Sequence, residues 1–231
     1  MKVLNFGSLN LDYVYQVNSI LIPGETQAST DRKIFCGGKG LNQSIALAKA
    51  GVTVYHAGMI GEGGGILLET CRENNVNTKF IRQISGPSGH TVIQVDKNGQ
   101  NCILLYGGAN RSITREFANE VLEHFEKGDI FFLDIDLKEK NGIKIAEKIR
   151  ENNSNAIIIF VSAMNDMIFD SLIVQPFYFI RKDNFDRDMK IACTLIQKYI
   201  NKNHKIITFD FNGKKNSYSI IRYHLFRIVF T

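Results

Sequence analysis

The feature that most constrains the fold is a regular alternation of apolar, strand-like runs with helix-like segments in the second half of the chain. The alternating segments are the apolar runs 129–135, 156–161 and 177–180 and the helical patterns 142–152, 167–174 and 185–201. Such a β-α-β-α-β-α order favours parallel strands joined by right-handed crossovers, with helices packed on the sheet. The sequence therefore predicts an α/β fold with a parallel sheet in this part of the chain.

The first half mixes the same elements with hairpin signals. Strands are predicted at 2–7, 52–57 and 79–84, and helices at 41–50, 66–74 and 113–127. The strand-like segments 90–96 and 100–106 flank Asn98-Gly99, which is a strong signal for a β-hairpin. Pro23-Gly24 predicts a turn between two further extended stretches within 21–35. These segments predict a second, smaller group of β-strands beside the parallel sheet.

Composition narrows the class of protein. The chain has 231 residues, of which 44% are hydrophobic, enough to build the core of one large or two small domains. No apolar run approaches the roughly 20 residues needed to span a bilayer, and the N-terminus does not resemble a signal peptide. The four cysteines are scattered without the spacing of a zinc site or a disulfide framework. We therefore expect a cytoplasmic protein without a metal-ligand cluster.

Charge and glycine content both change along the chain. Residues 1–129 contain 12 basic and 12 acidic side chains, whereas residues 130–231 contain 16 and 11. Of the 19 glycines, 17 precede Gly142. These shifts predict a domain boundary near Gly128–Asp129, with a first part at 1–128. A basic second part can bind nucleic acid, but a solvated, lysine-rich surface explains it better.

Polar and glycine residues after the first strand form a candidate ligand site. Asn10 and Asp12 follow that strand, and Gly37-Gly38-Lys39-Gly40 leads into a helix that carries Asn42. Side chains of Asn and Asp can pair with neighbouring hydroxyls of a polyol, and glycines allow the backbone to approach a ligand. Gly40 follows Lys39 where a Walker A loop needs Ser or Thr. The same pattern is also compatible with an ordinary tight turn before a helix.

Four motifs together resemble ribokinase and the pfkB-type carbohydrate kinases. They are GSLNLD (7–12), PGET (23–26), GGKGLNQS (37–44) and GPSGHTVIQVDKNGQNCILLYGGAN (86–110), in the family's order. The resemblance covers residues 1 to about 128. It implies that Asn10, Asp12, Gly38, Lys39 and Asn42 contact the sugar, and that ATP and magnesium take part in the reaction. It also implies a small β lid over the site, through which two copies can form a homodimer.

The chain departs from that family where catalysis is concerned. The family's G-x-G-D motif, whose Asp is the catalytic base, does not occur in these 231 residues, and neither does its N-x-x-E motif. We therefore expect an incomplete, sugar-binding portion that lacks the ATP-binding and catalytic segment. No catalytic residue is assigned, and binding of the sugar is expected to be weak.

The second half resembles the receiver of a LytTR-type response regulator. The run DIFFLDIDLKEKNGIKIAEKIR (129–150) implies that Asp134 is the phospho-acceptor, with Ser162 and Lys182 at the conserved hydroxyl and lysine positions. All three follow predicted parallel strands at their carboxyl ends, where open α/β sheets place their sites. They are also compatible with ordinary polar residues at strand ends. The acidic pair that binds magnesium in receivers is missing, so efficient phosphorylation of Asp134 is not expected.

These resemblances predict a chimera with three parts. They are a ribokinase-like portion at 1–128, a partial flavodoxin-like receiver fragment at 129–203, and the start of a LytTR-like DNA-binding domain at 204–231 that contains a β-hairpin. The strand at 129–135 can occupy the next place in the kinase sheet, so the first two parts can share one sheet. The leading function is binding of a ribose-type sugar. The alternative is a truncated signalling or DNA-binding module.

Overall fold

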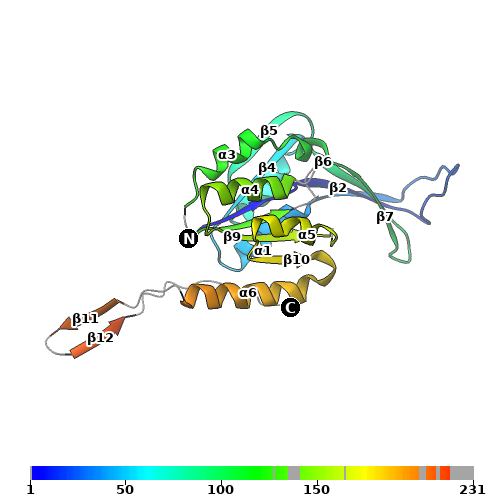
Figure 1. Ribbon diagram of the computed structural model, residues 1–231. Coiled ribbons are helices and arrows are strands. Elements are labelled where there is room, and N and C mark those ends of the chain that lie inside the picture. Colours follow the sequence, from blue (N-terminus) through cyan, green and yellow to red (C-terminus); the bar gives the residue numbers. More distant parts are fainter. Residues whose placement is uncertain are drawn as a thin grey trace.

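The computed structural model describes residues 2–126, 128–134, 141–163, 165–202, 207–211 and 214–218. A six-stranded sheet in the order β10-β9-β8-β1-β4-β5 runs through the molecule, and all of its neighbouring strands are parallel (Figure 1). Its strands are β1 (Val3–Phe6), β4 (Val54–Glu62), β5 (Asn77–Pro87), β8 (Ile130–Asp134), β9 (Ile157–Ser162) and β10 (Tyr178–Arg181). The predicted parallel sheet is thus confirmed.

Helices cover both faces of this sheet, as Figure 1 shows. On one face, α3 and α4 bury Phe117 and Ile149 against strand residues such as Phe131. On the other, α1, α2 and α6 pack against strand residues such as Phe132. The helices are α1 (Lys39–Lys49), α2 (Gly65–Glu73), α3 (Arg115–Leu122), α4 (Asn141–Asn152), α5 (Met167–Ser171) and α6 (Phe185–Lys202). Successive residues of β8 point to opposite faces, which explains why the strand is apolar throughout.

The main sheet continues without interruption across the predicted boundary at Gly128–Asp129. Strand β8 lies between β1 and β9, with Val3 opposite Ile130 and Ile130 opposite Ile157. The buried Asp129 fixes this junction, because its carboxylate accepts hydrogen bonds from the backbone amides of Lys2 (2.7 Å) and Glu126 (3.0 Å). Residues 130–181 therefore extend the sheet that begins with β1, as the shared-sheet alternative predicts.

A second, four-stranded sheet projects from one end of the main body (Figure 1). Its order is β3-β2-β6-β7, in which β2 and β6 are parallel and the outer pairs are antiparallel. The strands are β2 (Asn10–Gln16), β3 (Asp31–Gly37), β6 (Gly89–Val95) and β7 (Asn101–Tyr106). The hairpin predicted around Asn98-Gly99 is formed by β6 and β7. We call these four strands the lid sheet.

Two strands near the C-terminus, β11 (Ile207–Phe211) and β12 (Lys214–Tyr218), pair antiparallel. They lie within residues 204–231, where the sequence predicts a β-hairpin. Residues 212–213 and 219–231 lie outside the described residues. Among the described segments, no helix combines the length and apolarity needed to cross a bilayer. All four cysteines are free.

A buried polar network links β1, α1 and β4 inside the protein. The amide nitrogen of Asn5 donates to the carbonyl of Gly40 and to the hydroxyl of Ser44, both at 2.9 Å. His56 contacts that hydroxyl through Nδ1 (2.8 Å) and the carbonyl of Gly7 through Nε2 (3.1 Å). His56 is completely buried. Burial lowers the pKa of His56 to about 4, because a charged imidazole would lose its hydration, and the bond to Gly7 offsets this only in part.

This low pKa predicts a pH dependence of stability. A histidine with a folded-state pKa of about 4 and an ordinary unfolded value of 6.5 stabilises the fold fully above pH 6.5, and this contribution is lost as pH falls towards 4. Between pH 7.5 and 5 the loss is about 2 kcal/mol. Urea unfolding measures the free energy of unfolding at both pH values. Between pH 7.5 and 5 this free energy should fall by about 2 kcal/mol more in the wild type than in His56→Gln. Equal losses in the two proteins would contradict the prediction.

Candidate functional site

A cavity of about 510 Å³ lies where the lid sheet meets the carboxyl ends of β1 and β8. All five residues predicted to contact a sugar line it, namely Asn10, Asp12, Gly38, Lys39 and Asn42. The cavity wall also contains polar residues that the sequence analysis did not assign to this site, namely Ser8, Thr91, Asn110, Arg111 and Asp134. The structure thus brings the first predicted constellation together in one place.

Asn10 is held by a second asparagine. Asn110, in the 3-10 turn η1 (Gly108–Ser112), binds the backbone of Leu9 at both its amide (3.0 Å) and its carbonyl (3.1 Å). Its amide nitrogen also donates to Oδ1 of Asn10 at 2.8 Å. Oδ1 of Asn10 already accepts this hydrogen bond. The side-chain NH₂ of Asn10 therefore remains as a hydrogen-bond donor towards a ligand in the cavity. Gly89 leaves the space for this contact, since a Cβ there would lie 2.0 Å from the Asn110 amide nitrogen.

Asp12 is oriented by a hydroxyl on the neighbouring strand. Thr91 of β6 lies opposite Asp12 of β2, and its hydroxyl donates to Oδ1 of Asp12 at 2.6 Å. The other oxygen, Oδ2, lies over Gly37, where a Cβ would approach it to 1.9 Å. A side chain at position 37 is therefore incompatible with this orientation of the carboxylate. Asp12 remains as an acceptor in the cavity wall.

The glycines before α1 allow two backbone segments to meet. Gly38 has a φ of +98°, a conformation that suits glycine, and a Cβ there would lie 2.6 Å from the carbonyl oxygen of Ser8. The amide of Leu41 donates to that same carbonyl at 3.1 Å. Lys39 and Asn42 lie in the first turn of α1, and both side chains are exposed towards solvent or cavity. The helix therefore begins directly beside the segment that carries Asn10.

The lid sheet contributes an apolar wall to the cavity. Ile93 of β6 and Ile103 and Leu105 of β7 line it, on the same face of the lid sheet as Asp12 and Thr91. Ile103 and Leu105 are 55% and 60% exposed, which is high for aliphatic side chains. Polar groups on one side and aliphatic groups on the other suit a ligand that has hydroxyls on one face and C–H groups on the other.

The second predicted constellation meets the first. Asp134, at the carboxyl end of β8, lines the same cavity and is almost fully buried. Lys182 forms an ion pair with its Oδ1 at 2.9 Å. Ser162 ends the neighbouring strand β9 and is also buried. Asp134 and Lys182 are thus together as predicted, and Asp134 lines the same cavity as the first constellation.

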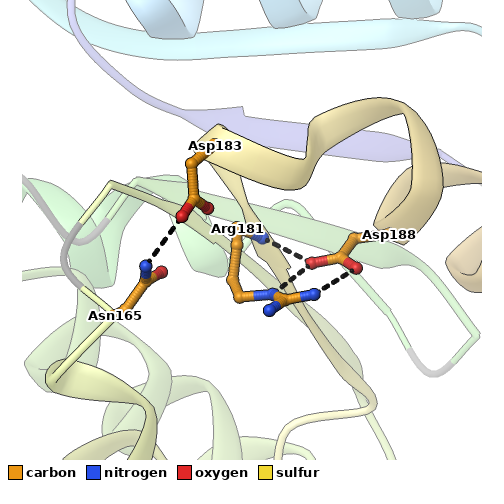
Figure 2. Close-up of polar contacts among 4 residues, drawn as sticks. All are labelled: Asn165, Arg181, Asp183 and Asp188. Atoms are coloured by element: carbon orange, nitrogen blue, oxygen red, sulfur yellow. Dashed lines mark hydrogen bonds and ion pairs between the residues drawn. The ribbon is translucent and has the colours of Figure 1, made fainter.

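The segment that carries Lys182 is itself fixed by polar contacts (Figure 2). Arg181 donates from Nε (2.7 Å), Nη2 (2.9 Å) and its backbone amide (3.1 Å) to the carboxylate of Asp188 in α6. The Arg181 guanidinium holds the pKa of Asp188 below its usual range. On the other side of Lys182, Asp183 in η4 (Lys182–Asn184) accepts a hydrogen bond from Asn165 at 3.0 Å. These contacts explain how an exposed turn can hold a lysine on a buried carboxylate.

Within the described part of the chain, no three His, Cys, Asp or Glu side chains lie close enough together to hold a metal ion. Asp136, the acidic residue two positions after Asp134, lies outside the described residues.

Comparison with known proteins identifies one family over most of the chain. A model described as pfkB family carbohydrate kinase matches residues 1–180. The match continues past Gly128–Asp129 and includes the segment that resembles a receiver. The comparisons thus give no support to a chimera or to a fused LytTR-type response-regulator fragment, and the predicted receiver origin of residues 129–180 is corrected to the kinase family.

Several ribokinases are similar to this chain in sequence. The ribokinase of Dictyostelium discoideum is 24% identical over 236 residues, which are 90% of this chain and 73% of that protein. The ribokinase of Bacillus subtilis is 31% identical over 136 residues, 58% of this chain and 46% of that protein. The chain also covers only about half the length of two further ribokinases, 45% of the Arabidopsis thaliana protein and 51% of the Haemophilus influenzae protein.

Solved structures show the same fold. Ribokinase from Thermotoga maritima has a TM-score of 0.68 and 23% identity, with 96% of this chain and 79% of that chain covered. Arabidopsis thaliana ribokinase complexed with ribose and ATP has a TM-score of 0.65 and 21% identity, with 95% and 78% covered. The parallel central sheet and the second, small sheet are therefore those of the ribokinase-like fold.

The contact between Thr91 and Asp12 yields a prediction for binding of ribose, the sugar that the resemblance implies. Thr91→Val keeps the shape of the side chain but removes the hydrogen bond that orients the carboxylate. We expect about a tenfold loss of ribose affinity, the effect of one hydrogen bond to a charged group. A ribose titration followed by NMR measures it. Thr91→Ser keeps the hydroxyl and should bind like the wild type, and equal affinities of the valine and serine variants would contradict the prediction.

Proposed function

Because the chain belongs to the pfkB family of carbohydrate kinases, we propose that its cavity binds a sugar of the ribose type. The observation that carries this proposal is the convergence of Asn10, Asp12, Gly38, Lys39 and Asn42 on one cavity. Its volume of about 510 Å³ falls within the range of roughly 300–1,000 Å³ that is usual for small-molecule sites. A ribose-type sugar is also the ligand class implied by the relatives' names.

The chemistry of the lining matches the two characters of a sugar. Asn10 is left with an NH₂ donor and Asp12 with a carboxylate acceptor, so neighbouring hydroxyls can pair with both. The ammonium of Lys39 and the amide of Asn42 come from the start of α1. The aliphatic groups of Ile103 and Leu105 face them from the lid sheet and can cover the C–H face of the sugar ring.

The first prediction from this proposal concerns affinity. We expect ribose to bind with a dissociation constant weaker than micromolar, because the chain spans only about half the length of several ribokinases that it matches, so that fewer hydroxyls can be paired. Isothermal calorimetry at millimolar ribose measures it. Asn42→Ala should abolish detectable binding, whereas alanine at the exposed Asn98, in the distant hairpin turn, should leave it unchanged. Micromolar or tighter binding, or binding that ignores Asn42→Ala, would contradict the prediction.

A second prediction concerns catalysis. We propose that this chain by itself does not transfer a phosphoryl group from ATP to the sugar. Phosphoryl transfer needs positioned groups that take the hydroxyl proton and stabilise the transferred charge. The G-x-G-D and N-x-x-E motifs that supply them in the family do not occur in these 231 residues. A coupled assay with ribose, ATP and magnesium should show no production of ADP above background, and turnover that is lost in Asp12→Ala would show that other residues supply the chemistry.

The alternative of a signalling or DNA-binding module is not favoured. Asp134 could be named as a phospho-acceptor, but its carboxylate is buried and paired with Lys182. We propose that Asp134, held by Lys182, forms part of the wall of the sugar cavity and does not accept phosphate. No observation points to nucleic acid or to a membrane as a partner. The four free cysteines support the proposed cytoplasmic location.

A homodimer through the lid sheet is a further part of the proposal. On the face opposite Asp12 and Thr91, one row of paired residues crosses the sheet, namely Ile34, Tyr13, Val92 and Leu104. Ile34 and Leu104 are 42% and 70% exposed. A continuous apolar row of this kind is typical of an interface, and a second copy can cover it with the same row in a two-fold arrangement.

Sedimentation velocity tests this assembly. We expect the wild type to form dimers at micromolar concentration and Leu104→Asp to shift it towards monomer, because a carboxylate in the apolar row would lose its hydration on association. The matched control is Gln100→Asp, which adds the same charge at the exposed turn before β7. Monomeric wild type at all accessible concentrations, or dimers of unchanged affinity in Leu104→Asp, would overturn the proposed interface.

A further inference from the structure

The network of Asn5, Ser44 and His56 lies directly behind the cavity, although none of the three lines it. We propose that His56 is a positioning residue for the sugar site, which holds the segment that carries Asn10 against the helix that carries Lys39 and Asn42. The inference rests on the proposed function, because it concerns the same site. It assigns a role to His56, a buried histidine that does not line the cavity itself.

A single placement of hydrogens is consistent with all four contacts of the network, although Oδ1 of Asn5 is buried without a hydrogen-bond partner among the described residues. The NH₂ group of Asn5 donates both of its hydrogens, one to the carbonyl of Gly40 and one to the hydroxyl oxygen of Ser44. The hydroxyl hydrogen of Ser44 is then available to Nδ1 of His56, which must be the acceptor. The imidazole proton therefore lies on Nε2, from which it is donated to the carbonyl of Gly7. His56 is thus neutral and has one defined tautomer.

The two ends of the network lead directly to the ligand-binding segments. Gly7 is followed by Ser8 and, two residues later, Asn10, both of which line the cavity. Gly40 and Ser44 lie on either side of Asn42 in α1. One imidazole therefore holds both the carbonyl of Gly7 and the hydroxyl of Ser44. It thereby fixes the distance between the segment that carries Asn10 and the helix that carries Lys39 and Asn42.

The geometry of this junction makes such a device necessary. Gly7 and Gly40 meet backbone to backbone, since a Cβ on Gly40 would lie 2.5 Å from atoms of Gly7. Neither glycine has a side chain that could interlock with the other segment. The position of α1 along the Gly7–Asn10 segment is then set by directional contacts, which are the bond from Leu41 to Ser8 and the His56 network. An apolar ring at position 56 would fill the space but leave a buried carbonyl and a buried hydroxyl without this partner.

The experiment compares three single variants of the full chain, and the double variant of His56→Phe with Ser44→Ala, with the wild type. His56→Phe removes both imidazole contacts, and Ser44→Ala removes the hydroxyl that joins His56 to Asn5. The matched control is Ile149→Val, in α4 on the opposite face of the main sheet, which should lower stability without touching the network. The measurements are ribose affinity by NMR titration, the urea midpoint, and amide hydrogen exchange of residues 7–11 and 38–44 with and without ribose.

We expect His56→Phe and Ser44→Ala each to weaken ribose binding about tenfold and to speed exchange in both segments about tenfold without ribose. Their combined effect should be smaller than the product of the single effects, because both remove the same network. Ile149→Val should lower the urea midpoint and change neither quantity. If folded His56→Phe and Ser44→Ala retain wild-type affinity and exchange, the inference is wrong. A wild type that binds no ribose would refute the proposed function, and exchange without ribose would then decide the inference alone.

Discussion

The approach of two backbones at Gly7 and Gly40 is the constraint on which the rest of the site depends. A Cβ on either residue would overlap the other segment, so the start of α1 can reach the end of β1 only where both positions are glycine. This contact places the first turn of α1 beside Ser8, and the bond from Leu41 to Ser8 secures it. The polar wall of the cavity is therefore built from two segments that are remote in sequence and in direct backbone contact.

The two sheets contribute different chemistry to the cavity. The main sheet supplies the buried carboxylate of Asp134, which is held by Lys182, and α1 supplies the exposed side chains of Lys39 and Asn42. The lid sheet supplies Asp12, whose orientation depends on Thr91 of the neighbouring strand, and the exposed aliphatic groups of Ile103 and Leu105. Under the proposed function, fixed polar groups would pair with the hydroxyls of the sugar and the lid sheet would cover its C–H groups.

Local patterns predicted most elements, because strand and helix periodicities are properties of neighbouring residues. The helix predicted at 113–127 is shorter in the structure, since α3 spans only Arg115–Leu122 and is capped by Thr114, and the strand β2 was not predicted. The predicted sugar-contact residues, which a family motif pointed to, do converge on one cavity. Thr91 and Asn110 were missed as site residues, although both lie within the quoted motif at 86–110. Their roles depend on the parallel pairing of β2 with β6 and on the return of η1 to Leu9, which no local pattern reveals.

The interpretation of the second half failed for a physical reason. Scarcity of glycine after Gly142 suggested a different domain, but strands in the interior of a parallel sheet need apolar side chains and no close backbone contacts. The glycines gather where β1, α1 and the lid sheet meet. Strand β8 resembles a receiver strand because buried parallel strands with an acidic residue at the carboxyl end are common to many α/β folds. The match of residues 1–180 to the pfkB family distinguishes the two origins.

The exposed aliphatic wall of the lid sheet has a thermodynamic consequence. Binding of a polyhydroxylated ligand is usually expected to be driven by hydrogen bonds, with little change in heat capacity. Here the same ligand would also remove water from Ile103 and Leu105, which are more than half exposed. Burial of apolar surface gives a negative change in heat capacity. The enthalpy of sugar binding to this chain should therefore become steadily more favourable as temperature rises, a hydrophobic signature for one of the most polar classes of ligand.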